Sequence, residues 1–190
     1  MPAWHTDREK QTLFDEVALV HMAGLYYAAL RLTGRPADAE DLLQETYLRA
    51  YAAFDRFTLG TNARAWLYRI MHNLFLNTVS RAETRRTQSF SATPPATLAA
   101  VADPGAPDPA AGVDAMLDHR LSAALAALPA DFRSAVVTVD VGGFSYDEAA
   151  TILGCPVGTV RSRLYRARHL LRTALANDRA TLLEGGHADV

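Results

Sequence analysis

The chain has 190 residues, of which 49% are apolar, and its formal charge is −2 at pH 7. This length suits one or two small domains, and a single cysteine excludes an internal disulfide, which fits a reducing cytoplasm. The first ten residues are polar, and no run approaches the roughly 18 apolar residues of a membrane span, so we expect no signal peptide and no membrane span.

The N-terminal third of the sequence predicts two helices. Residues 7–32 carry apolar side chains at helical spacing, and Thr33-Gly34 followed by Pro36 indicates a helix end and a new start. Residues 36–54 have an apolar stripe with a period near 3.6, which predicts a buried face; it consists of Leu43, Tyr47, Tyr51 and Phe54. A different face carries acidic and amide side chains, for which a solvated helix surface is the ordinary interpretation: Asp38, Asp41, Gln44 and Glu45.

A third helix is expected over 63–81, after a short loop that contains Gly60. Its apolar stripe is Trp66, Leu67, Ile70 and Leu74. Phe75 and Leu76 point away from that stripe, so this helix is either sandwiched in the core or offers aromatic surface to a partner. Residues 64–88 hold five arginines against one glutamate, which indicates a nucleic-acid footprint or a solvated basic face.

Residues 88–112 read as a linker. They hold five of the nine prolines and few large apolar groups, so the segment cannot offset the entropy of ordering itself and should be flexible. The charge is acidic across this stretch and just beyond it, through Asp103, Asp108, Asp114 and Asp118. We therefore expect a first domain over 7–87 and a second over 113–180.

The second domain opens with an ambiguous segment. Residues 131–141 include Val136, Val137 and Val139, and such a β-branched run favours a strand on propensity alone. Phe132, Val136 and Val139 also fit one helical face, and Gly142-Gly143 is typical of a helix end. We predict a helix here, and an all-α fold of two small helical domains joined by the flexible, acidic, Pro- and Ala-rich linker.

Residues 144–172 form the most specific pattern in the chain. Ser145 with Glu148 is a capping box that begins a short helix, Gly154 ends it, and Pro156 suits the opening of the next helix. This is a helix-turn-helix, whose second helix must project side chains into a DNA major groove. Residues 149–177 hold five arginines and no acid, although a helical hairpin with a basic outer face is the competing interpretation. The candidate base and phosphate contacts are Thr159, Arg161, Ser162, Arg163, Arg166 and Arg168.

These residues carry a resemblance to a known family. GTVRSRLYRAR at 158–168, preceded by FSYDEAATILGCPV, resembles the region 4 signature of extracytoplasmic-function RNA polymerase sigma factors. DAEDLLQETYLRAYAAFDRF at 38–57 resembles the core-binding part of region 2, and NARAWLYRIMHNLFLN at 62–77 resembles its promoter-melting helix. The DLLQET and GTNARAWLYRI blocks are most similar to the branch that is paired with redox- or stress-responsive anti-sigma factors.

The resemblance implies a cytoplasmic subunit that binds core RNA polymerase, through its β′ and β subunits, and directs initiation at promoter DNA. The C-terminal domain would read the −35 element. The N-terminal domain would melt the −10 element, using Asn62, Arg64, Arg69, His72, Asn73 and Arg81. The face implied to contact polymerase is Asp38, Asp41, Leu42, Gln44 and Glu45, with Leu42 as an exposed apolar centre. An anti-sigma factor would hold the chain inactive, and the linker would thread toward the polymerase active centre.

No catalytic constellation is legible, so we expect a non-enzyme without a cofactor. The six histidines show no metal-ligand spacing with Cys155, which reads as a small buried residue beside the turn. Two alternatives stay open at this point. One is a stand-alone helix-turn-helix regulator with an N-terminal sensing domain, and the other is an interaction module or an enzyme for an anionic substrate.

Overall fold

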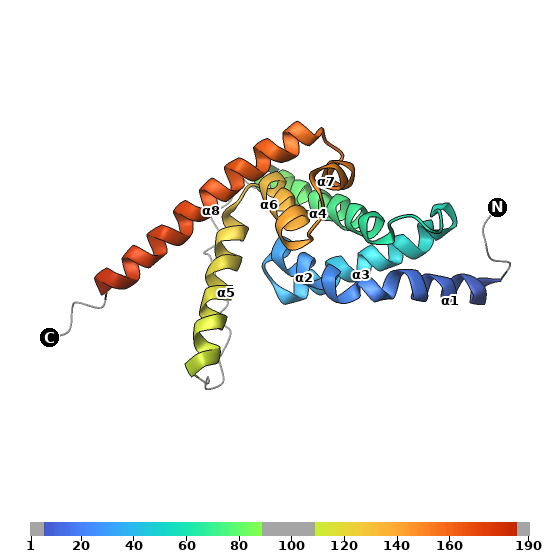
Figure 1. Cartoon of the computed structure of the whole chain (residues 1–190), viewed down its shortest axis with the longest axis horizontal. Helices are drawn as coiled ribbons and strands as arrows, with labels where there is room; N and C mark the ends of the chain where they lie inside the picture. The colour runs from blue at the N-terminus through green and yellow to red at the C-terminus, as the bar shows by residue number, and fades with distance from the viewer. Residues whose placement is uncertain (1–5, 89–108, 186–190) are drawn as a thin grey trace.

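The computed structural model describes residues 6–88 and 109–185, and within these ranges the chain is helical without any strand (Figure 1). The all-α prediction is therefore confirmed. Most of the predicted linker, and with it the proposed path toward the polymerase active centre, falls outside the described residues.

The N-terminal helices begin and end where local signals place them. Thr6 and Glu9 form a capping box at the start of α1. Gly34 ends α2 with φ of 75°, a left-handed conformation that glycine adopts without steric cost, and Pro36 opens α3. The elements are α1 Asp7–Ala18, η1 Leu19–His21, α2 Met22–Thr33, α3 Pro36–Ala53, η2 Phe54–Arg56 and α4 Ala63–Gln88.

Helix α3 turns a slightly different face to the core than the apolar stripe predicts. Its buried residues are Ala39, Leu42, Thr46 and Ala50, whereas Leu43, Tyr47 and Tyr51 are only half-buried. Ala39 and Ala50 are small, and helix α3 packs against α2. The Thr46 hydroxyl is satisfied within the helix because it donates to the Leu42 carbonyl at 2.7 Å. The half-buried tyrosines pack edge-on against Phe14 of α1 instead.

The C-terminal helices include the ambiguous β-branched run. Val136 and Val137 are buried in a helical conformation that changes to a π-helix at η3, where the Gly142 amide donates to the Val137 carbonyl at 2.8 Å. Burial of the valines overrides their strand propensity, so the helix prediction is confirmed. The elements are α5 Pro109–Ala127, α6 Ala130–Val136, η3 Val137–Val141, α7 Tyr146–Leu153 and α8 Val157–Gly185.

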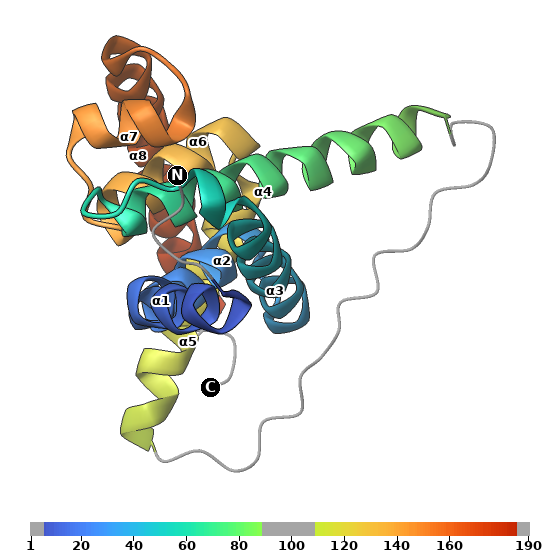
Figure 2. The ribbon, with the colours of Figure 1, turned by 90° about the vertical axis from the view of Figure 1, so that its right-hand side faces the viewer.

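The two sets of helices share one continuous apolar core. Helix α4 contacts α3 among the N-terminal helices and α7 among the C-terminal helices. Its own side chains Leu67, Tyr68, Met71 and Phe75 are buried. Of the two alternatives that the sequence left open for this helix, the structure shows the one in which it is sandwiched in the core. The C-terminal half of α4 extends out of the body of the molecule (Figure 2).

Residues 7–33 are the stretch that bears on the expectation of no membrane span. Among the described helices, this stretch alone is long and apolar enough to cross a membrane, with a mean hydropathy of 1.2 over its best window. In the structure it spans α1, η1 and α2, and Phe14, Leu25 and Ala29 from it are buried in the protein core.

Candidate nucleic-acid and partner interfaces

The helix-turn-helix has the geometry that its sequence predicts. The Ser145 hydroxyl accepts the Glu148 amide at 3.3 Å, and a Glu148 carboxylate oxygen accepts the Ser145 amide at 2.9 Å. This capping lowers the pKa of Glu148, because the backbone and hydroxyl of Ser145 hydrogen-bond to its charged form. Gly154 turns the chain with φ of 64°. Ile152 of α7 and Leu164 of α8 are buried against the turn, which fixes the outward face of α8.

The outward face at the start of α8 is basic and aromatic. Arg161, Ser162 and Arg166 are exposed, and Thr159 is half-buried. Tyr165 lies on the same face and is 73% exposed, although the sequence reasoning did not select it. The signal was available, since Tyr165 stands four residues after Arg161. The Arg161 guanidinium lies 5.7 Å from the Tyr146 ring, which orients it beside the turn.

Two of the six predicted −35 residues are occupied inside their own domain. Arg163 pairs with Asp131 at 2.6 Å. Arg168 binds Asp140 through two nitrogens, at 2.5 and 3.1 Å, and these hydrogen bonds raise its pKa. The bidentate pair fixes the Arg168 guanidinium in place, and Arg163 makes one charged hydrogen bond to Asp131, so these two arginines join α8 to η3 and α6.

The loop before α4 is organised by Asn62. Its side-chain oxygen accepts the Ala65 amide at 3.0 Å, so Asn62 is a helix N-cap as well as a candidate DNA contact. Its amide nitrogen donates to Glu148 of α7 at 3.2 Å. Arg64 donates to the Gly142 carbonyl and is half-buried. Asn62 of the loop and Arg64 in the first turn of α4, both predicted −10 residues, therefore contact the C-terminal domain.

A groove of about 410 Å³ lies between α3 and α4. Asn73 and Asn77 of α4 face Arg49 and Arg56 from the side of α3 and η2. Amide and guanidinium groups on an apolar floor of alanine, leucine and isoleucine can hydrogen-bond a base edge and hold a phosphate. Of the other predicted −10 residues, Arg69 and Arg81 are exposed on α4.

The structure contradicts the expected exposure of His72. This side chain is 5% exposed, and its Nδ1 has no hydrogen-bond partner among the described residues. Burial lowers its pKa to about 4, with smaller opposing effects from Asp131 and Arg163 of the C-terminal domain. His72 is therefore a neutral residue packed at the contact between the domains, and it does not lie on a DNA-facing surface.

The predicted polymerase-binding face is partly correct in its exposure. Asp38, Asp41 and Gln44 are exposed and Glu45 is half-exposed. Leu42 is only 8% exposed, so its assignment as an exposed apolar centre is wrong. The sequence pattern placed Leu42 outside because the apolar stripe appeared to begin one residue later, at Leu43.

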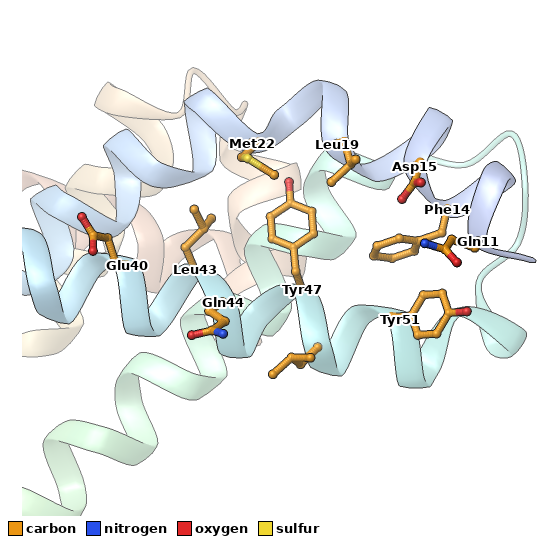
Figure 3. A pocket seen from close by; sticks show the side chains of 11 residues that line it. Gln11, Phe14, Asp15, Leu19, Met22, Glu40, Leu43, Gln44, Tyr47 and Tyr51 are labelled. Atoms are coloured by element: carbon orange, nitrogen blue, oxygen red, sulfur yellow. The ribbon is translucent and has the colours of Figure 1, made fainter.

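An apolar groove of about 530 Å³ runs beside this acidic face, between α1 and α3 (Figure 3). Leu19 and Met22 approach from the α1–α2 side, and Leu43, Tyr47 and Leu48 from α3. Leu48 is 60% exposed and supplies the apolar surface that was expected of Leu42. Burial raises the pKa of Tyr47 to about 12, so its hydroxyl stays protonated and donates to the Ala18 carbonyl at 3.0 Å.

The described residues contain no group of three or more His, Cys, Asp and Glu that could hold a metal ion. Cys155 is half-buried beside the turn, and its sulfur accepts a long hydrogen bond from Arg163 at 3.7 Å.

Comparison with known proteins gives two family matches in the predicted order. Residues 19–86 match the model of sigma-70 region 2, and residues 118–171 match that of sigma-70 region 4. The ECF RNA polymerase sigma factor SigE of Mycolicibacterium smegmatis is 39% identical over 93% of this chain, which spans 63% of that relative. The ECF RNA polymerase sigma factor EcfG of Rhodopseudomonas palustris is 38% identical, over 89% of this chain and 88% of the relative.

Two solved structures are similar to most of the chain. One is the sigma factor RpoE in complex with the anti-sigma factor NepR from Bartonella quintana, with a TM-score of 0.67 and 32% identity over 86% of this chain and 96% of RpoE. The other is CnrH in complex with the cytosolic domain of CnrY, with a TM-score of 0.61 and 25% identity over 88% of this chain and 90% of CnrH.

Proposed function

Because the chain belongs to the extracytoplasmic-function sigma factors, we propose that its two domains divide promoter recognition between the −35 and −10 elements. As a member of this family it directs promoter-specific transcription initiation. The stand-alone regulator is not favoured, because a match to sigma-70 region 2 over residues 19–86 has no place in it.

The C-terminal domain reads the −35 element through the exposed start of α8. The observation that carries this proposal is the capped helix-turn-helix that leaves Arg161, Ser162 and Arg166 exposed on one face. Arginine can bind guanine with two hydrogen bonds, and the serine hydroxyl can reach a base or a phosphate. We add Tyr165 to this set, because its ring lies among them and offers apolar contact to a thymine methyl group.

The N-terminal domain opens the −10 element with α4 and the loop before it. Separating a base from the stack costs a few kcal/mol, so the strand needs a site that offers both hydrogen bonds and stacking surface. The groove between α3 and α4 supports this role through Asn73, Asn77, Arg49 and Arg56. Asn62 immediately precedes α4, and Arg64 lies in its first turn.

Core polymerase binds the exposed acidic face of α3, and the β′ subunit is the partner we propose for it. The acids Asp38, Asp41 and Glu45 would orient a basic partner surface, which affects the association rate more than the affinity. The neighbouring apolar groove with Leu48 would supply the buried centre of the contact. We propose that the C-terminal domain contacts the β subunit.

An anti-sigma factor is the regulatory partner that the structural relatives suggest. RpoE is bound to the anti-sigma factor NepR, and CnrH to the cytosolic domain of CnrY. We propose a partner of the same class for this chain, a stress-responsive role, a cytoplasmic location and no catalytic activity of its own, since polymerase supplies the chemistry.

In vitro transcription tests the proposal. Purified chain and bacterial core polymerase are incubated with a pool of random-sequence promoters, with core alone as the control. We expect start sites that depend on the chain and share −35 and −10 elements. Asn73→Ala should impair opening at the −10 element, whereas Thr78→Ala, on an exposed position of the same helix, should not. DNA binding by the chain alone, without initiation, would contradict the proposal.

A further inference from the structure

The two exposed arginines at the DNA-facing start of α8 differ in their surroundings. The Arg161 guanidinium lies over the ring of Tyr146, the first residue of α7, at 5.7 Å from the ring centre. The Arg166 guanidinium makes no ion pair, hydrogen bond or ring contact with the residues that the structure describes. One of the two side chains is therefore held beside the turn before DNA arrives, whereas the other can sample its rotamers.

The Tyr146 side chain is itself anchored by the rest of the domain. The capping box at Ser145 fixes the backbone where α7 begins, and the half-buried Tyr146 ring packs against the apolar core. The tyrosine hydroxyl lies beside the Arg168 guanidinium, where Asp140 is the main cause of the raised pKa of Arg168 and Tyr146 a smaller one. The ring that faces Arg161 thus has a fixed position relative to α8.

The spacing on α8 explains how one tyrosine can contact two arginines. Arg161 and Arg168 are seven residues apart, which places them two turns apart on the same side of the helix, at about 10 Å along its axis. Tyr146 stands along this side, with its ring next to the first guanidinium and its hydroxyl next to the second. Arg168 is fixed in turn by two hydrogen bonds to Asp140 of η3, at 2.5 and 3.1 Å.

An aromatic ring orders a guanidinium without using its hydrogen-bond donors. Arg163 and Arg168 donate N–H groups to carboxylates, which removes those donors from DNA recognition. A ring face instead attracts the cation as a whole, so the N–H groups of Arg161 stay available for a base edge or a phosphate. Such a contact is weak at an exposed site, so Arg161 can move from the ring to DNA at little cost.

We propose that Tyr146 is a positioning residue for promoter recognition: its ring holds Arg161 in the orientation that contacts the −35 element. The inference rests on the −35 role proposed above for Arg161. An arginine that becomes ordered only on binding loses its rotamer freedom at that step, whereas an arginine that is already ordered does not. Tyr146 therefore increases promoter affinity through Arg161, and it has no such effect through Arg166.

A double-mutant cycle on the holoenzyme tests the inference. Promoter affinity is measured for the full chain bound to core polymerase, with Tyr146→Leu combined with Arg161→Ala and, as the matched pair, with Arg166→Ala. Leucine keeps an apolar side chain against the core and removes the ring, whereas Tyr146→Phe keeps the ring and removes only the hydroxyl. Phe132→Leu is the control for loss of a half-buried aromatic ring elsewhere in the domain.

We expect Tyr146→Leu to weaken promoter affinity roughly three- to tenfold, both in the wild type and in Arg166→Ala. In Arg161→Ala the same change should have no further effect, because the side chain that the ring positions is gone. Tyr146→Phe should stay within about twofold of the wild type, since a phenylalanine ring also attracts a cation. Phe132→Leu should show equal effects in the Arg161→Ala and Arg166→Ala backgrounds.

The order of the two guanidiniums can also be measured without DNA. Nitrogen-15 relaxation of the arginine Nε–H groups in the free chain reports motion on the ps–ns timescale. We expect the Arg161 group to be ordered in the wild type and in Tyr146→Phe and mobile in Tyr146→Leu. The Arg166 group should be mobile in all three. The comparison of Arg161 with Arg166 within the wild type stays decisive even if Tyr146→Leu fails to fold.

Either of two results would overturn the inference. If the losses of promoter affinity in Tyr146→Leu and Arg161→Ala multiply in the double variant, the two residues act independently and Tyr146 serves only the fold. If the Arg161 group is as mobile as the Arg166 group in the wild type, the ring does not order it. Unchanged promoter affinity in Arg161→Ala alone would instead contradict the −35 role of Arg161, and the relaxation measurement would still decide whether the ring orders this side chain.

Discussion

Four arginines at the start of α8 are expected to fall into two groups with opposite phenotypes. Arg161 and Arg166 are exposed on the DNA-facing side, whereas Arg163 and Arg168 are paired with Asp131 and Asp140. Alanine substitution of Arg161 should weaken promoter binding and leave stability unchanged. Alanine substitution of Arg168 should lower stability and affect DNA binding only through the position of α8.

The structure sets the size of each effect. Arg168 and Asp140 are both partly exposed, so their pair contributes about 0.5–1 kcal/mol to stability, whatever the size of its effect on pKa. Removal of exposed Arg161 should change stability by less than about 0.5 kcal/mol. If Arg161 contacts a base, its loss should cost about 1–3 kcal/mol, which is a 5- to 150-fold loss of promoter affinity. If it contacts a phosphate, the slope of log affinity against log salt concentration should fall by about one.

Two measurements on the same variants separate the groups. Urea unfolding gives the stability, and competition between a promoter and random DNA for the reconstituted holoenzyme gives the affinity at several salt concentrations. Asp140→Asn is the control, because it should reproduce the stability loss of Arg168→Ala without removing a cation. If Arg168→Ala lowers promoter affinity as much as Arg161→Ala while Asp140→Asn has no effect on stability, the division into two groups is wrong.

Three further outcomes follow from burial and backbone geometry. His72 stays neutral in the folded state, with a pKa of about 4, whereas it is protonated below about 6.5 when unfolded; its stability contribution is complete above that pH and is lost as the pH falls toward 4. By pH 5 the free energy of unfolding, measured with urea, should have fallen by about 2 kcal/mol. His72→Gln should abolish this part of the pH dependence of the free energy of unfolding. Leu42→Ala should destabilise the fold by about 2–5 kcal/mol, whereas Leu48→Asp should preserve stability and weaken pull-down of core polymerase; equal stability losses would contradict their different burial. Gly154→Ala should cost about 1 kcal/mol in thermal unfolding, because its φ is positive and an added Cβ meets no atom within 4 Å; a loss several times larger would point to a clash.

Sequence predicted best what is decided locally. The capping box at Ser145, the turn at Gly154 and the proline that opens α3 depend on residues within one helical turn, and each lies where it was expected. The burial of Leu42 and His72 could not be predicted from neighbouring residues in the sequence. It depends on which faces of α3 and α4 meet other helices, and for His72 the neighbouring charges Asp131 and Arg163 stand 59 and 91 residues further along the chain.

The same limit explains the miscounted charges. Within residues 149–177 five arginines stand without an acid, but Asp131 and Asp140 come from the preceding helices and neutralise two of them. The DNA-facing charge of α8 is therefore closer to the exposed Arg161, Arg166 and Arg172. On the other domain, Arg31 and Arg64 are engaged by the C-terminal helices, while the acids of α3 remain exposed. The acidic side chains of α3 and the basic side chains at the start of α8 are thus exposed on separate surfaces, so a basic protein partner and DNA can be attracted to different sides of the same chain.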